Sequence, residues 1–132
     1  MRVKLSICIA AAAVMLCGCA ASPQMLAAQK AFRESIPVCN GVSDCQVKWE
    51  AAQLWVVQNA GVKVQTATSV VIETYNSPES STRLAVRVTK EPLGGGRYRI
   101  VALAGCANIF GCQPNHLAAA LDFNRQVSAA VP

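Results

Sequence analysis

Residues 82–104, TRLAVRVTKEPLGGGRYRIVALA, decide the fold of this chain. Apolar and polar side chains alternate over residues 82–90, which predicts a β-strand with one buried face. Pro92 and three consecutive glycines within residues 91–96 are typical of a tight turn. Residues 97–104 alternate again and predict the second strand of a hairpin. The expected inward residues are Leu84, Val86 and Val88 in the first strand, and Tyr98, Ile100 and Ala102 in the second.

Another strand is expected before this hairpin. Residues 62–75, VKVQTATSVVIETY, alternate over most of their length and predict one long strand. Residues 76–80 then form a turn, so the three strands are expected to make an antiparallel meander. Val101 and Leu103 are apolar on the outward face of the last strand, which predicts that this end of the sheet is covered on both sides.

Two long helices flank the strands in the sequence. Residues 43–60 and residues 115–131 both show apolar residues at helical spacing, and Asn115 is the expected N-cap of the second helix. The order is therefore a helix, a three-stranded antiparallel meander and a C-terminal helix. A sheet with one apolar face needs helices packed against it, so this order predicts a two-layer α+β fold.

The sequence of residues 43–60 makes predictions about the ends of this helix and about its two tryptophans. Ser43 and Gln46 have capping-box spacing at its start, and Gly61 is expected to end it in a left-handed conformation. Trp49 and Trp55 are six positions apart, which places them about 120° apart around the helix. The helix is therefore either covered on two sides or leaves one tryptophan exposed.

The start of the chain has the pattern of a secretion signal. Arg2 and Lys4 give a short positive stretch, and residues 5–16, LSICIAAAAVML, form an apolar run of 12 residues. A helix that spans a bilayer needs about 20 apolar residues, so this run fits a signal peptide better. Removing 18 residues from the 132 leaves 114, which is enough for one domain with a core of its own.

The motif Leu16-Cys17-Gly18-Cys19 resembles the lipobox of bacterial lipoproteins. The resemblance implies that Cys19 becomes the first residue and carries a diacylglycerol, whose two acyl chains would hold the domain at a membrane. Ala20 after the cysteine implies sorting to the outer membrane, facing the periplasm. An ordinary secretory signal cleaved near Ala20 is the alternative. The expected division is a signal peptide (1–18), a lipidated tether with a short helix opened by Pro23 (19–36) and one α+β domain (37–132).

Four further cysteines, Cys39, Cys45, Cys106 and Cys112, are expected to form disulfides in an oxidising periplasm. The C-x5-C spacing, present twice, favours local bridges 39–45 and 106–112. Bridges between the two pairs stay open, because Cys45 and Cys106 are expected at the same end of the domain. A zinc site or a redox-active pair is not expected, since these typically use C-x2–4-C and C-x-x-C spacings.

Charge suggests one candidate binding patch. Without Arg2 and Lys4 the chain holds 10 basic and 7 acidic residues, a formal charge of +3, with no basic module that would indicate nucleic-acid binding. If the faces of the two hairpin strands coincide, four arginines form a candidate patch for phosphate or carboxylate groups of lipopolysaccharide, peptidoglycan or a protein partner. The alternative is a solvated sheet face. The four are Arg83, Arg87, Arg97 and Arg99.

The loop between Cys106 and Cys112 is the second candidate for contact with a partner. If Ile109 and Phe110 point outward, they can anchor a partner; if they point inward, as we expect, they plug one end of the domain. His116 is the only histidine, and we expect it in solvent in the first turn of a helix.

These features predict a membrane-anchored envelope lipoprotein that acts as a non-enzymatic binding or structural module. No catalytic residues, cofactor or metal ligands are expected, since no spacing singles out a nucleophile, a paired acid or a phosphate loop. The first alternative is an accessory lipoprotein of a secretion or conjugation apparatus, or of surface exclusion. The second is a cell-wall hydrolase, which would need a pocket with His116 beside a carboxylate.

Overall fold

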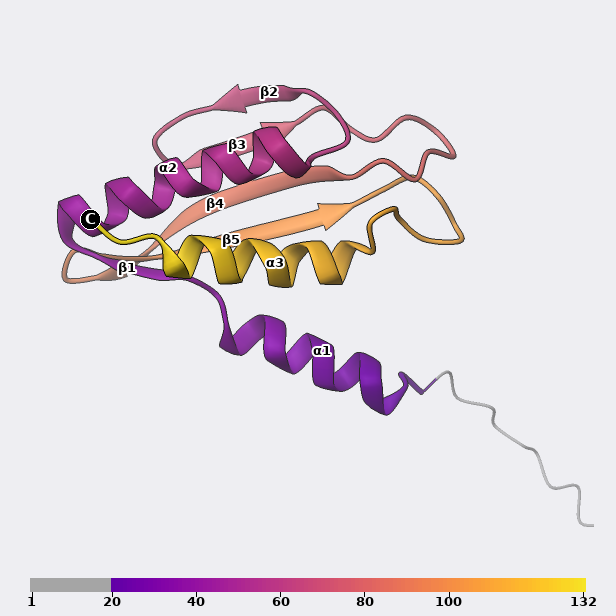
Figure 1. Cartoon of the computed structure of the whole chain (residues 1–132), viewed down its shortest axis with the longest axis horizontal. Helices are drawn as coiled ribbons and strands as arrows, with labels where there is room; N and C mark the ends of the chain where they lie inside the picture. The colour runs from indigo at the N-terminus through magenta and orange to yellow at the C-terminus, as the bar shows by residue number, and fades with distance from the viewer. Residues whose placement is uncertain (1–19) are drawn as a thin grey trace, which may run out of the picture.

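A five-stranded antiparallel sheet forms one layer of the protein, with the strand order β1-β5-β4-β3-β2 (Figure 1). The computed structural model describes residues 20–132, so the signal peptide and Cys19 lie outside the described residues. The predicted α+β class is confirmed. The elements are α1 (Pro23–Glu34), β1 (Val38–Asn40), α2 (Gly41–Asn59), β2 (Val64–Ala67), β3 (Val71–Thr74), β4 (Ala85–Gly94), β5 (Arg97–Gly105) and α3 (His116–Ala129).

The sheet has two more strands than the predicted meander. Residues 62–75 do not form one strand, because the chain turns back at Thr68 and gives the β2–β3 hairpin. The Thr68 hydroxyl accepts hydrogen bonds from the N–H groups of Val70 and Val71, at 3.2 and 3.0 Å, and closes this turn. Strand β1 was not predicted; its three residues pair with β5 and are too few to show an alternating pattern.

Helices α2 and α3 form the second layer and cover one face of the sheet (Figure 1). The predicted inward residues of β4 and β5 point at this layer, and Val88 and Ile100 are fully buried. The other face is open: Leu103 on β5 is 62% exposed. The prediction that this end of the sheet is covered on both sides is therefore wrong, because α1 packs on α3 and leaves the outer face bare.

Both tryptophans of α2 are buried, so this helix is covered on two sides. The Trp49 indole N–H donates to the carbonyl oxygen of Thr68 at 3.0 Å. The Trp55 indole N–H donates to the Asp122 carboxylate at 2.8 Å, and its ring packs edge-on against Phe123 with centroids 5.3 Å apart. The Trp55 hydrogen bond is the main cause that lowers the pKa of Asp122. One tryptophan thus joins α2 to the β2–β3 turn and the other joins it to α3.

The start of α2 differs from the predicted capping box. The helix begins at Gly41, and Asn40 is its N-cap without a side-chain capping bond. The Asn40 N–H instead donates to the Asp44 carboxylate at 2.8 Å, and Lys48 forms an ion pair with Asp44 at 3.0 Å. The hydrogen bond from Asn40, followed by that from Lys48, lowers the pKa of Asp44. Ser43 is therefore not the cap, because the disulfide at Cys39 and the β1 strand move the start of the helix upstream.

Helix α1 is opened by Pro23, as predicted, with the Ser22 hydroxyl accepting from the Met25 N–H at 3.2 Å. Its C-terminal end docks on α3: the buried Asn124 amide donates to the Phe32 carbonyl and the Ser35 hydroxyl, at 3.1 and 3.0 Å. Asn115 caps α3 as predicted. None of the helices in residues 20–132 is both long and apolar enough to span a bilayer.

Gly61, expected as a left-handed helix end, has another role. It does not adopt a positive φ, and α2 ends at Asn59 with Ala60 in an extended conformation. A Cβ at Gly61 would lie 2.7 Å from the Arg83 Cβ and 2.9 Å from the Leu84 backbone nitrogen. The Gly61 N–H also donates to the Leu84 carbonyl at 2.9 Å. Glycine is needed here because two backbone segments touch.

Replacing Gly61 with alanine should therefore lower the free energy of unfolding by about 1–3 kcal/mol, since the backbones must move apart. The measurement is the urea midpoint at unchanged m-value. Gly105→Ala is the matched control, because a Cβ there meets nothing within 4 Å and the φ of Gly105 is not positive. Equal stability of the two variants would contradict this close-contact role.

Candidate functional site

The four cysteines of the domain form two local disulfides, Cys39–Cys45 and Cys106–Cys112, with Cα atoms 4.8 and 5.6 Å apart. The favoured pairing is the one observed, and bridges between the two pairs do not form. The first disulfide ties β1 to the first turns of α2. The second closes the loop that leads from β5 to α3. No thiolate is left in the domain for a four-cysteine metal site.

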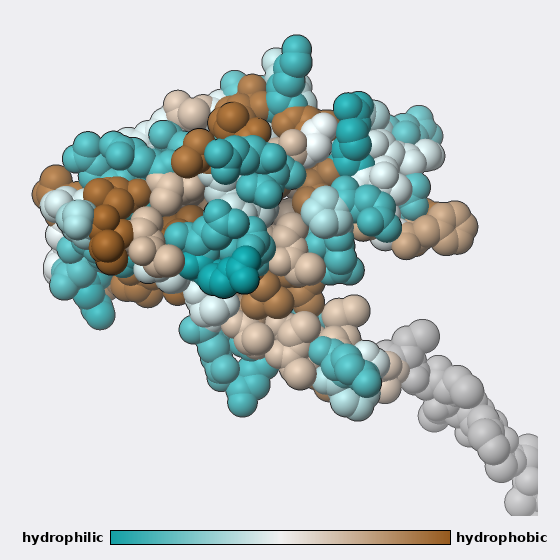
Figure 2. All heavy atoms as spheres, viewed as in Figure 1, coloured by the Kyte–Doolittle hydropathy of each residue, from teal (hydrophilic) through white to brown (hydrophobic). Residues whose placement is uncertain are grey.

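The loop of the second disulfide holds Ile109 and Phe110 outward. Their side chains are 92% and 93% exposed, so the expectation that they plug the domain is wrong. We call these two residues the Phe110 tip. Figure 2 shows the loop between β5 and α3 projecting from one end of the molecule as an apolar protrusion.

Hydrogen bonds hold this loop in place in addition to the disulfide. The Asn108 side chain accepts from the Phe110 N–H at 2.9 Å and donates to the Ser80 carbonyl at 2.8 Å. The Gln113 N–H donates to the Thr82 carbonyl at 2.9 Å. The tip is therefore mounted on the 76–84 loop and cannot fold back onto the core without breaking these bonds.

A second candidate lies at the opposite end of the sheet. We call it the Lys90 cleft; it has a volume of about 430 Å³, within the range of about 300–1,000 Å³ that is usual for small-molecule sites. Helix α2, the β2–β3 turn and the ends of β4 and β5 meet around it. The lining residues are Gly41, Val42, Cys45, Gln46, Trp49, Ser69, Lys90, Gly96 and Tyr98.

Lys90 is the charged residue of this cleft. Its Nζ lies 5.4 Å from the centroid of the Trp49 ring and 5.3 Å from that of the Tyr98 ring. Both distances permit cation–π attraction, which contributes about 0.5–2 kcal/mol. Among residues 20–132 no carboxylate forms an ion pair with Lys90. The ammonium group is thus held in place by rings and keeps its hydrogen-bond donors free for a ligand.

The backbone of β4 explains why a lysine reaches this position. Leu84, Val86 and Val88 point inward, and Lys90 continues the same phase of the strand. It pairs with Ile100 across the ladder, and Ile100 is fully buried. Lys90 is not among the residues predicted from the sequence. The available signal was a lysine at a position where the alternation demands an apolar residue.

The four predicted arginines do not form one patch. Arg97 pairs with Gly94 at one end of the β4–β5 ladder, whereas Arg83 precedes Ala85 at the other. The nine positions from Ala85 to Gly94 correspond to about 30 Å of strand. Arg83 and Arg97 therefore lie at opposite ends of the sheet.

Arg87 and Arg99 share the open face of the sheet, but each has a carboxylate partner. Arg87 pairs with Glu73 at 3.9 Å, and Arg99 pairs with Glu91 at 2.6 Å. The hydrogen bond from Arg99, followed by that from Thr89, lowers the pKa of Glu91. The charges of these two arginines are thus partly balanced within the protein.

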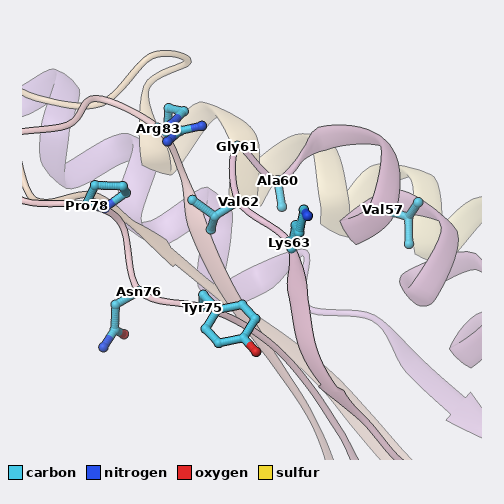
Figure 3. A pocket seen from close by; sticks show the side chains of 9 residues that line it. All are labelled: Val57, Ala60, Gly61, Val62, Lys63, Tyr75, Asn76, Pro78 and Arg83. Carbon is cyan, nitrogen blue, oxygen red and sulfur yellow. The ribbon is translucent and has the colours of Figure 1, made fainter.

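Arg83 lines a second, shallow cleft of about 540 Å³ at the end of α2 (Figure 3). Lys63 and Tyr75 come to it from other segments. Neither Arg83 nor Lys63 forms an ion pair within residues 20–132. The cleft therefore presents two positive charges beside the loop on which the Phe110 tip is mounted.

His116 is exposed at the first residue of α3, as expected. None of the ion pairs within residues 20–132 includes it.

Comparisons with protein-family models, curated proteins and solved structures found no match. The chemistry of the Lys90 cleft must therefore be inferred from its own residues. A lysine held between two aromatic rings beside an apolar wall can bind the anionic group of a ligand whose body packs on Val42 and Trp49.

Proposed function

We propose that this protein is a lipid-anchored, non-enzymatic binding module of the bacterial envelope, at the outer membrane and facing the periplasm. The resemblance of Leu16-Cys17-Gly18-Cys19 to a lipobox supports the anchor. The two disulfides are consistent with an oxidising compartment outside the cytoplasm.

The binding role rests on one observation, the uncompensated Lys90 inside a cleft with aromatic walls. Lysine is rarely placed on the inner face of a sheet without a carboxylate, because burial disfavours its charge. Here two rings replace the carboxylate and leave the ammonium group accessible. Such an arrangement favours binding of an anion, since the lining residues include neither a histidine nor a carboxylate that could pair with Lys90 or activate Ser69.

The ligand that fits is a carboxylate or phosphate attached to a sugar ring or another compact apolar body. The anion would meet Lys90 Nζ, and the ring would lie against Val42 and Trp49. Aromatic faces suit sugar rings because the C–H groups on one side of a pyranose form an apolar face that packs on the π-system. Anionic groups of peptidoglycan or lipopolysaccharide have this chemistry.

An accessory role in a secretion or conjugation apparatus, or in surface exclusion, is the second candidate. The open sheet face favours it, because Val38 and Leu103 are exposed there at 45% and 62%. A protein partner could cover this face together with the paired Arg87 and Arg99. A cell-wall hydrolase would need a carboxylate beside His116, and none of the ion pairs within residues 20–132 includes this histidine.

The affinity of the protein for two sugars, measured by titration calorimetry, tests the proposed ligand chemistry. N-acetylmuramic acid should bind, and N-acetylglucosamine, which lacks the carboxylate, should bind more weakly. Lys90→Gln should weaken binding of the acid by about tenfold or more, because a charge-assisted hydrogen bond contributes roughly 1.5–3 kcal/mol. Lys63→Gln is the matched control, since it removes the same charge from the other end of the domain. Equal binding of both sugars, or unchanged binding by Lys90→Gln, would contradict the proposal.

The anchor prediction concerns Cys19. Mass spectrometry of the mature protein should show an acylated first residue, and Cys19→Ser should move the protein from the membrane fraction to the soluble periplasm. The Cys19→Ser protein should keep the affinity of the Lys90 cleft. An unacylated wild-type protein that begins near Ala20 would show that the leader is an ordinary signal.

A further inference from the structure

The Phe110 tip, Ile109 and Phe110, is the most exposed apolar feature among residues 20–132. A single exposed apolar residue needs no explanation, but two neighbours that the fold holds out in water do. The disulfide and the Asn108 bonds already described keep them from collapsing onto the core. Because apolar side chains in water are unfavourable, we expect another apolar surface to cover the tip.

The position of the tip suggests which surface this is. The loop that carries it and the Pro23 end of α1 lie at the same side of the domain, at the right of Figure 1. Cys19 is separated from α1 by residues 20–22 alone. Because α1 is docked on α3 through Asn124, a membrane that holds Cys19 would lie on the side toward which the tip points.

The charges around the tip fit a lipid surface. Hydrogen bonds tie the tip loop and the 60–63 segment to the 76–84 loop, so the three segments share one end of the domain. Lys63 and Arg83 are basic, Glu79 is the one acidic residue, and the tip loop itself has no charged residue. Basic residues beside an apolar wedge favour the interface of a bilayer with anionic headgroups.

We propose that the Phe110 tip inserts into the interfacial region of the bilayer that carries the lipid anchor. Lys63 and Arg83 then lie at the headgroups, and the Lys90 cleft, at the other end of the sheet, opens away from the membrane. The acyl chains retain the protein, and the tip fixes its orientation. This inference rests on the proposed anchor at Cys19 but not on the ligand of the cleft.

The test uses the full-length mature protein as the bacterial cell processes it, reconstituted with vesicles of phosphatidylethanolamine and phosphatidylglycerol. In Phe110→Trp, fluorescence should shift to the blue on reconstitution, and lipids brominated on their acyl chains should quench the added emission. The native tryptophans contribute little to this quenching because both are buried. Leu93→Trp is the matched control: Leu93 is 43% exposed near the β4–β5 turn, at the opposite end, and its tryptophan should be neither shifted nor quenched.

The outcomes separate the two proposals. If the protein fails to float with the vesicles, the anchor is wrong. If it floats but position 110 is quenched no more than position 93, the insertion is wrong and the anchor stands. A blue shift of position 110 that occurs in native envelope membranes but not in pure lipid would show that a protein covers the tip, which also overturns the insertion.

Discussion

The burial of two tryptophans from one helix, in two directions, is the constraint on which the rest of the structure depends. Trp55 joins α2 to α3 through Asp122 and Phe123, and so closes the helical layer. Trp49 joins α2 to the β2–β3 turn through the Thr68 carbonyl. A helix that presented only one of these rings inward would cover either the sheet or its helical neighbour, but not both.

The same constraint creates the proposed ligand site. Trp49 is a core residue on one side and a wall of the Lys90 cleft on the other. Its indole N–H donates to the Thr68 carbonyl, and its ring face lies 5.4 Å from Lys90 Nζ. The Cys39–Cys45 disulfide fixes the first turns of α2 beside it. Fold and site therefore share one helix, and a change at Trp49 would affect both.

Local patterns predicted the α+β class, the β4–β5 hairpin, the Asn115 cap and the pairing of the cysteines. They failed where contacts with distant parts of the chain determine the local structure. The alternation of residues 62–75 conceals a turn made by the Thr68 hydroxyl, and β1 becomes a strand only because β5 offers an edge. Gly61 is conformationally ordinary, and its importance comes from Arg83 and Leu84, which are distant in the sequence.

The central claim is that the ammonium group of Lys90 is held between the faces of Trp49 and Tyr98 in the free protein. Ring currents shift nearby protons upfield, so a ¹³C–¹H correlation spectrum of the lysine side chains tests this contact directly. The ε-methylene protons of Lys90 should lie clearly upfield of those of the exposed Lys30 and Lys63, and should move back toward them in Trp49→Leu. Overlap of Lys90 with the exposed lysines in the wild-type spectrum would contradict it.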